Sequence, residues 1–264
     1  MCPWKGQKTM QIDINSDLGE SFGAYKIGQD EAVIPMVSSV NVACGFHGGD
    51  PLVIRKTVEM AKRYGVAVGA HPGFPDLQGF GRRNMYLHPD DVYASMIYQI
   101  GAVRAFTDLY NLPLQHVKPH GAINNMAAVD MDLARILAQA IYDYDKNLIL
   151  LAVAGTKLAQ AGREVGLQVA NEVFADRTYE PDGTLRNRKY PDALIRDPVV
   201  AARRVVEMVK DRVLVAIDGS KISVQPDSVC LHGDGEAAVA IARTLREELT
   251  NHGIEIRPLL DVQP

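Results

Sequence analysis

The sequence lacks several features that would place it in a common class. No apolar run approaches the roughly 18 residues that a membrane-spanning helix needs. No basic stripe is present, and a formal net charge of −4 is untypical of a dedicated nucleic-acid binder. Residues 1–9 have no apolar middle, so we expect a short flexible tail there and not a secretory signal. These absences favour a cytoplasmic protein that binds neither membranes nor nucleic acid.

Cysteine is scarce. The chain has three cysteines, Cys2, Cys44 and Cys230, and the last two lie in apolar, strand-like runs. An odd number in such positions predicts reduced thiols of a cytosolic protein and no disulfide framework. We interpret Cys44 as a small buried hydrophobic residue and not as a nucleophile.

Several catalytic signatures are also missing. The chain has no HExxH motif, no CxxC pair and no GxSxG elbow, which disfavours the standard zinc proteases and serine hydrolases. No GxxxxGK[ST] loop occurs, so any ATP is not held by a P-loop. No glycine-rich fingerprint follows the first apolar run, which disfavours a dinucleotide-binding fold.

What the chain does have is a regular alternation of two patterns. Its 264 residues are 47% hydrophobic, enough for one large α/β domain. Continuous apolar runs, typical of parallel strands covered on both faces, alternate with longer helical patterns. The predicted strands are residues 10–15, 40–44, 66–70, 115–118, 148–152, 167–174 and 228–231. This order predicts a parallel sheet, either closed as a barrel or doubly wound, in a single domain over residues 10–264.

Helix boundaries are marked by capping residues. Asp50-Pro51 begins one predicted helix, which ends at Gly65. His88-Pro89 and Asp197-Pro198 begin two more, residues 235–251 form the last predicted helix, and a weaker pattern covers residues 130–142. The connections 72–87 and 176–196 are long for a compact domain, so we interpret them as binding loops or lids.

Polar residues that could take part in catalysis or binding follow nearly every predicted strand. Because the carboxyl ends of parallel strands open onto one face, we expect these residues to share a site. The candidates are Asp13, Asn15, Asp17, Glu20, His47, His71, Lys118, His120, Glu172, Asp176, Arg177, His232 and Asp234. Carboxylates and imidazoles supply general acids, general bases or metal ligands, and Lys118 could stabilise an oxyanion or bind a phosphate.

Some polar residues have simpler explanations. Asp50 and His88 have the positions of helix caps, and His116 and His252 look like ordinary strand-start or surface residues. Asp13 could equally be a structural residue bonded to a neighbouring amide. Arg82 and Arg83 could be solvated, although adjacent guanidiniums on a glycine-rich loop suit a carboxylate or phosphate.

Six motifs together resemble the LamB/YcsF family, whose members are the A subunits of 5-oxoprolinase. They are DINSDLGESFG at 13–23, NVACGFHGGDP at 41–51, GAHPG at 69–73 with GFGRR at 79–83, KPHGA at 118–122, FADR at 174–177 and HGD at 232–234. They run in order over nearly the whole chain.

The resemblance implies a fold and an activity. The fold would be a distorted seven-stranded parallel β/α barrel, similar to that of carbohydrate deacetylases. The activity would be ATP-dependent cleavage of 5-oxoproline to glutamate, together with two partner chains, the B and C subunits of 5-oxoprolinase, and with ATP and Mg²⁺ bound with those partners. Phosphorylation of the lactam oxygen would make the ring carbon electrophilic. A homo-oligomer is also possible.

Roles follow from the resemblance as hypotheses. Catalytic candidates are Asp17, His47, His71, Lys118, His120, Glu172, His232 and Asp234, with Asp17 or His120 as the base. Substrate-binding candidates are Asp13, Asn15, Glu20, Arg82, Arg83, Asp176 and Arg177. By analogy with the deacetylases, Asp17, His71 and His120 could hold a divalent metal ion.

The sequence departs from the family pattern near the fourth predicted strand. Residues 122–125 read AINN where the family usually has an aromatic residue, which leaves a related lactam open as the substrate. Two further functions stay open. One is a stand-alone metal-dependent hydrolase of C–N bonds, and the other is a non-catalytic substrate-binding subunit.

Overall fold

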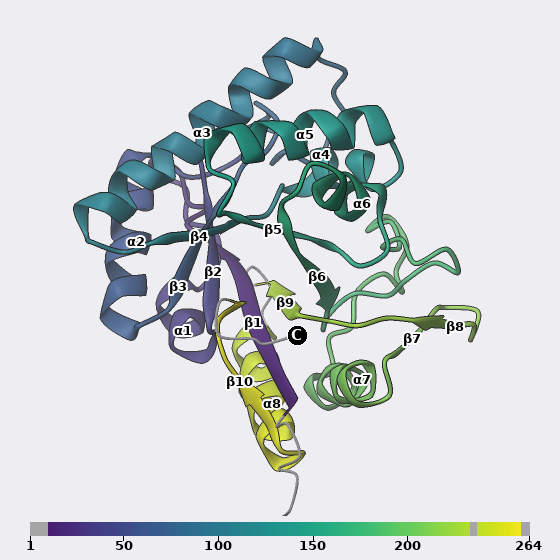
Figure 1. Cartoon of the computed structure of the whole chain (residues 1–264). Coiled ribbons are helices and arrows are strands. Elements are labelled where there is room, and N and C mark those ends of the chain that lie inside the picture. Colours follow the sequence, from purple (N-terminus) through teal and green to yellow (C-terminus); the bar gives the residue numbers. More distant parts are fainter. Residues whose placement is uncertain (1–9, 233–236, 260–264) are drawn as a thin grey trace, which may run out of the picture.

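Seven parallel strands form a closed barrel at the centre of the structure, a computed structural model that describes residues 10–232 and 237–259 (Figure 1). The barrel strands are β1 (Met10–Leu18), β2 (Ser39–Ala43), β3 (Ala67–His71), β4 (Leu114–Val117), β5 (Ile149–Val153), β6 (Gln168–Phe174) and β9 (Ser228–His232). They pair in that order, and β9 pairs with β1 to close the barrel. The predicted α/β barrel and its seven strands are confirmed.

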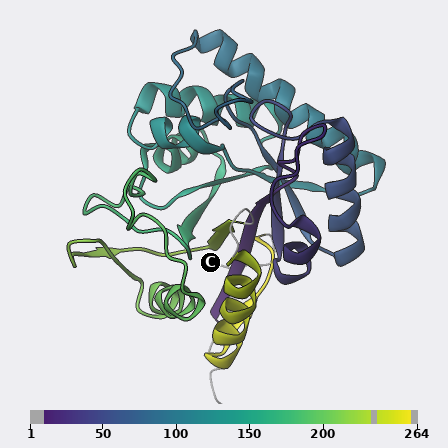
Figure 2. The ribbon, with the colours of Figure 1, turned by 180° about the vertical axis from the view of Figure 1, so that it is seen from behind.

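Helices surround the barrel on its outside, as Figures 1 and 2 show from opposite directions. They are α1 (Asp30–Val33), α2 (Pro51–Tyr64), α3 (Pro89–Leu109), α4 (Gly121–Ala127), α5 (Met131–Tyr144), α6 (Lys157–Glu164), α7 (Pro198–Lys210) and α8 (Ala238–Asn251), with a 3₁₀ turn at Ile34–Met36. Helices α7 and α8 pack against each other beside β1 and β9.

Three short strands were not predicted from the sequence. Strands β7 (Val213–Val215) and β8 (Lys221–Ser223) form an antiparallel hairpin outside the barrel, next to α7 (Figure 1). Strand β10 (Ile254–Ile256) pairs with the first residues of β1. Helices α4 and α6 were not predicted either. The proposed tail, residues 1–9, lies outside the described residues, and the single-domain organisation stays a prediction.

The helix caps expected from the sequence are present. The Asp50 carboxylate accepts hydrogen bonds from the amides of Leu52 and Val53 at the start of α2, and Gly65 ends that helix in the left-handed conformation at φ 66°. Asp197 caps α7 in the same way. His88 accepts from the amide of Asp90 at the start of α3, so its role as a cap is confirmed.

The barrel has an apolar outside and a largely polar inside. Alternation along β1 sends Ile12 and Ile14 into the core between strands and helices, while Asp13, Asn15 and Asp17 face the lumen. Apolar residues of β5 and β6 fill part of the lumen together with Leu259. Burying polar groups in the lumen costs free energy unless each group has a hydrogen-bond partner. The available hydrogen bonds therefore determine which polar side chains can occupy the lumen.

His116 corrects one expectation. The sequence predicts an ordinary strand-start or surface position for it, but it lies on β4 and is fully buried in the lumen. Its Nε2 lies 2.7 Å from Oδ1 of Asn41 on β2. The ring also covers Gly69 on β3, where the β3–β4 register shifts. A β-carbon at Gly69 would come within 2.1 Å of His116 Nε2, so this position requires glycine.

We therefore expect Gly69→Ala to destabilise the barrel by about 1–3 kcal/mol, the usual cost of overpacking. The matched control is Gly101→Ala in α3, where the nearest heavy atoms to the added carbon are 3.9 Å away. That change should leave the stability equal or raise it by up to about 1 kcal/mol. Urea denaturation of both variants measures the difference, and equal stabilities would contradict the close approach of His116.

Asp13 lies at the end of the lumen opposite the strands' carboxyl ends. Its carboxylate accepts hydrogen bonds from Ser38 at 2.7 Å and Ser39 at 2.8 Å, and also from Ser228. Burial raises the pKa of Asp13 to about 6; the serine hydroxyls lower it, and the charge of Glu172 adds to the increase. Asp13 is therefore a structural residue of the lumen floor, which was one of its two interpretations.

This raised pKa sets the sign of a pH effect. Between pH 3.8 and about 6 the unfolded chain loses the Asp13 proton while the folded chain keeps it. Stability should fall as the pH rises through that window, by up to about 3 kcal/mol from this group. Asp13→Asn should remove this part of the slope. Denaturation at pH 4.5 and pH 7 measures it, and identical slopes in the variant and the wild type would contradict the assignment.

Candidate functional site

A cavity of about 470 Å³ opens at the carboxyl ends of the barrel strands. This is the face on which parallel α/β barrels place their active sites. The cavity brings together residues from six of the seven barrel strands or the loops that follow them. Its polar lining includes Asp17, Glu20, His71, Arg82, Lys118, His120, Asn124, Asn125, Thr156, Arg177, Asp182, Thr184, Arg186, Asn187, Arg188 and His232.

Lys118 lies at the floor of the cavity with its ammonium group almost completely buried. Its Nζ lies 2.9 Å from Oδ1 of Asp17 and 2.8 Å from Oε1 of Glu172. It also lies 3.1 Å from the Cys230 sulfur. The cation is thus enclosed by two carboxylates and a thiol, each on a different strand.

A relay of amides fixes the same carboxylates. Asn41 donates to Asp17 at 2.8 Å and to Asn15 at 2.7 Å, and Asn15 donates to Glu172 at 3.0 Å. Nε2 of His116 in turn lies 2.7 Å from the amide oxygen of Asn41. Each polar group in the lumen therefore orients the next, from His116 up to the cavity floor.

The charges on the floor follow from this geometry. Burial alone would raise the pKa of Asp17, but His71 and Lys118 hold it well below its usual value. Burial would lower the pKa of Lys118, and Asp17, Cys230 and Glu172 raise it well above. Burial raises the pKa of Glu172, and Lys118 only partly opposes this. At neutral pH the floor holds a Lys118 cation against an Asp17 anion.

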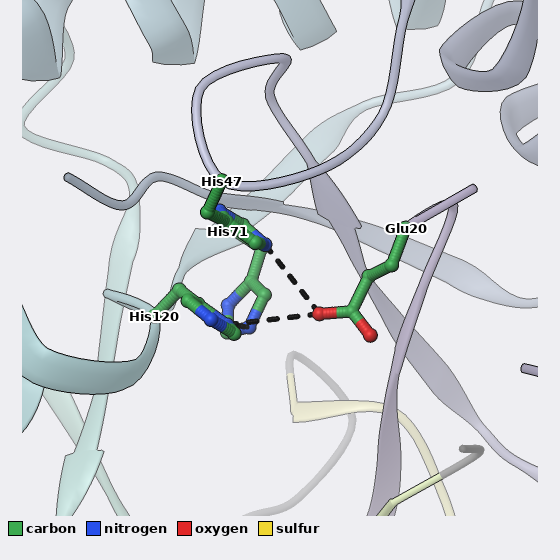
Figure 3. A group of neighbouring side chains, drawn as sticks. All are labelled: Glu20, His47, His71 and His120. Atoms are coloured by element: carbon green, nitrogen blue, oxygen red, sulfur yellow. Dashed lines mark hydrogen bonds and ion pairs between the residues drawn. The ribbon is translucent and has the colours of Figure 1, made fainter. Parts of the chain in front are cut away.

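Three histidines and a glutamate form a second group at the mouth (Figure 3). Glu20 follows β1, His47 follows β2, His71 ends β3 and His120 follows β4. Their ligand atoms lie within 4.8 Å of one another, and all four residues are buried. The rings of His47 and His120 stack 3.6 Å apart. Such a set of nitrogen and carboxylate donors can hold a divalent metal ion.

Asp176, which follows β6, and His232, which ends β9, form a further pair at the cavity. Nδ1 of His232 lies 2.8 Å from Oδ2 of Asp176 and so donates to it. Burial would raise the pKa of Asp176, but His232 lowers it. A carboxylate behind Nδ1 fixes the tautomer and leaves Nε2 available to take a proton, which is the arrangement of a general base.

Arginines form another part of the cavity wall. Arg177 is anchored by the carbonyls of Ala193 and Arg186. Burial lowers its pKa to about 10, and the charges of Arg188 and Arg82 add to this. Three guanidiniums thus raise the local positive potential, which favours an anion. Residues of the predicted binding loops 72–87 and 176–196 line the cavity, and their role in binding stays a prediction.

The structure gathers most of the candidates and separates a few. Asn15, Glu172 and Asp176 support the lining residues, and Asp13 lies deeper in the lumen. Arg83 does not line the cavity; its guanidinium pairs with Asp76 and its side chain is 64% exposed. Asp234 lies outside the described residues. For the metal, Glu20 and His47 join His71 and His120, whereas Asp17 is grouped with Cys230 and His232.

Sequence reasoning missed several contributors. His116, Asn41, Cys230 and Arg188 were not among the candidates. Alternation along β4 and β9 could have found two of them, because His116 lies two residues from Lys118 and Cys230 two residues from His232. Cys44 is a buried free thiol, as expected. Within the described part of the chain, the helices are too short or too polar to cross a membrane.

Comparison with known proteins agrees with this architecture. The sequence model of the LamB/YcsF family matches residues 12–264. The 5-oxoprolinase A subunit of Oceanobacillus iheyensis is 52% identical over 247 residues, 94% of this chain and 96% of that protein. The 5-oxoprolinase A subunit of Bacillus subtilis is 53% identical over 246 residues, 93% of this chain and 96% of that protein.

A solved structure has the same fold. The lactam utilization protein from Thermus thermophilus superimposes with a TM-score of 0.89 at 47% sequence identity, and the match covers 94% of this chain and 99% of that one. The family match covers almost every residue that builds the barrel and its cavity. The chain belongs to the LamB/YcsF family.

Proposed function

We propose that this chain is the A subunit of an ATP-dependent 5-oxoprolinase, and that its cavity binds 5-oxoproline and opens the lactam ring to give glutamate. Relatives that are about half identical over nearly the full length carry the name of that 5-oxoprolinase chain. ATP, with Mg²⁺, is bound together with the partner B and C subunits, and the complex is cytoplasmic. The single observation that carries the proposal is that a general-base pair, a buried cation and several arginines lie together at one small cavity.

The chemistry explains why both ATP and this cavity are needed. A lactam is a stabilised amide, so phosphorylation of its oxygen by ATP makes the ring carbon electrophilic. Water then adds to that carbon, the C–N bond breaks and the nitrogen takes up a proton, which leaves an acyl phosphate of glutamate. A second water molecule hydrolyses the acyl phosphate and releases phosphate. The products are glutamate, ADP and phosphate.

Each step has a candidate group. Asp176 orients His232, whose Nε2 accepts a proton from the attacking water. Lys118 stabilises negative charge that develops on the oxygen of the ring carbon. We therefore assign the base to His232 and not to Asp17 or His120. Burial alone would raise the pKa of Asp17, but His71 and Lys118 hold it well below its usual value, which makes this carboxylate a poor proton acceptor. Arg188 and Arg82 face the substrate carboxylate or the phosphoryl group.

We expect His232→Gln to lower kcat of the complex by about 100-fold or more, because glutamine cannot take up the proton. The side chain of His232 is 13% exposed at the mouth, so the fold should persist. The measurement is glutamate release from 5-oxoproline with ATP and both partner subunits, and His252→Gln on the surface is the control. Activity within threefold of wild type would favour a non-catalytic, substrate-binding role instead.

The arginine wall generates a separate expectation. Arg188→Gln should raise KM for 5-oxoproline by about 10- to 100-fold, the usual worth of one charged hydrogen bond, with a small effect on kcat. Arg196→Gln is the matched control, since Arg196 is an exposed arginine of the same loop that does not line the cavity. An unchanged KM in Arg188→Gln would place the substrate anion elsewhere.

A stand-alone metal-dependent hydrolase of C–N bonds is the second candidate, and the group of Glu20, His47, His71 and His120 favours it. A divalent ion there would polarise a carbonyl oxygen without ATP. The isolated chain would then turn over a lactam in the absence of ATP and partners, and a chelator would stop it. Strict dependence on ATP and both partners would reject this candidate.

A further inference from the structure

The protons of two histidines at the cavity mouth are fixed by backbone carbonyls. Nδ1 of His71 lies 2.6 Å from the carbonyl oxygen of Lys118, and Nε2 of His120 lies 2.8 Å from that of Phe80. A carbonyl oxygen only accepts, so each of these ring nitrogens carries the hydrogen. If a ring is neutral, its other nitrogen is a bare lone pair.

Those two lone pairs point at each other. Nε2 of His71 and Nδ1 of His120 are 2.9 Å apart. Two unprotonated nitrogens at that distance repel, and a positive particle between or beside them removes the repulsion. The particle is either a proton, which would make one ring an imidazolium, or a metal ion.

His47 decides between the two. It is completely buried, and its ring nitrogens form no hydrogen bond within the described residues, although Nε2 has a long contact of 3.4 Å with Oε1 of Glu20. Burial of an imidazole without a partner costs about 1–3 kcal/mol. One proton shared by His71 and His120 would leave His47 with only that long contact to Glu20, whereas a metal ion can accept a lone pair from all three rings at once.

The spacing of the donors fits such an ion. Nε2 of His47 lies 3.4 Å from Oε1 of Glu20, and Nδ1 of His120 lies 3.6 Å from the same oxygen (Figure 3). A tetrahedral ion with bonds of about 2.0–2.1 Å would place its ligand atoms roughly 3.3–3.4 Å apart. The Glu20 carboxylate supplies the negative charge that three neutral imidazoles lack.

The surrounding chain is shaped around these rings. A β-carbon at Gly73 would come within 2.7 Å of Nδ1 of His47, and one at Gly81 within 2.7 Å of its β-carbon. Gly81 also has a positive φ of 62°, which disfavours a side chain. His47 is thus confined in one orientation, as a ligand held ready before the ion arrives.

We propose that Glu20, His47, His71 and His120 bind one divalent transition-metal ion of the zinc class, through three imidazole nitrogens and one carboxylate oxygen. The carbonyls of Lys118 and Phe80 are the outer partners that set the ring orientations. Asp17 is not a ligand in this arrangement. Its Oδ1 accepts hydrogen bonds from Asn41 and Lys118, and its Oδ2 is 3.4 Å from Nε2 of His71.

The test uses the full isolated chain, so its outcome is independent of the 5-oxoprolinase proposal. The chain is purified without a metal-binding tag or chelator, and its metal content is measured by mass spectrometry. We expect about one zinc-class ion per chain. Apoprotein titrated with Co²⁺ should develop visible d–d absorption of a low-coordinate site, and Zn²⁺ should raise its Tm.

Four variants separate the ligand sets. His47→Ala and the isosteric Glu20→Gln should each weaken Zn²⁺ binding by at least about 100-fold, more than the loss of an outer partner costs. Asp17→Asn should keep the ion, and His252→Ala at the surface is the control. Glu20→Gln preserves shape, so it remains informative if His47→Ala does not fold.

Two results would overturn the proposal. One is less than a tenth of an ion per chain after titration with Zn²⁺ and Co²⁺. The other is loss of the ion in Asp17→Asn together with its retention in Glu20→Gln, which would assign the site to Asp17 and the deacetylase-like set.

Discussion

The buried Lys118 cation, held between Asp17 and Glu172, is the interaction on which the rest of the site depends. Removing one partner from a buried ion pair costs about 3–5 kcal/mol, because the remaining charge has no solvent to return to. The three side chains therefore fix one another, and the strands that carry them, β1, β4 and β6, cannot slide without breaking the set. The amides of Asn15 and Asn41 use the remaining acceptor positions of the carboxylates.

Lys118 also connects the floor of the cavity to its mouth. Its ammonium group binds Asp17, while its backbone carbonyl fixes the proton on His71. The charge network of the lumen and the histidine group are thus held by two ends of one residue. This arrangement separates two kinds of chemistry within one cavity: charge stabilisation below, and a cluster of imidazoles above. Burial, together with His71, lowers the pKa of His47 well below its usual value, which keeps that ring neutral.

Much of the site could be predicted from the sequence, because polar side chains recur at the ends of the apolar strands that form the barrel. Polar residues after successive apolar strands predict a common face, and the cavity does gather Asp17, His71, Lys118, His120 and His232. The sequence could not predict which of two adjacent loop residues points into the cavity. Arg82 and Arg83 are adjacent, yet one lines the cavity and the other pairs with Asp76, because the loop turns at Phe80 with a φ of 55°. Strands of three residues, such as β7 and β8, carry too little pattern to be recognised.

The central claim is that one cavity at the barrel mouth receives the lactam. A structure of the complex with the B and C subunits, crystallised with 5-oxoproline, tests it most directly. We expect the ring carbonyl next to Lys118 and His232, and the carboxylate against Arg188 and Arg82. Well-defined 5-oxoproline bound in one of the partner chains, with this cavity holding only water, would contradict it.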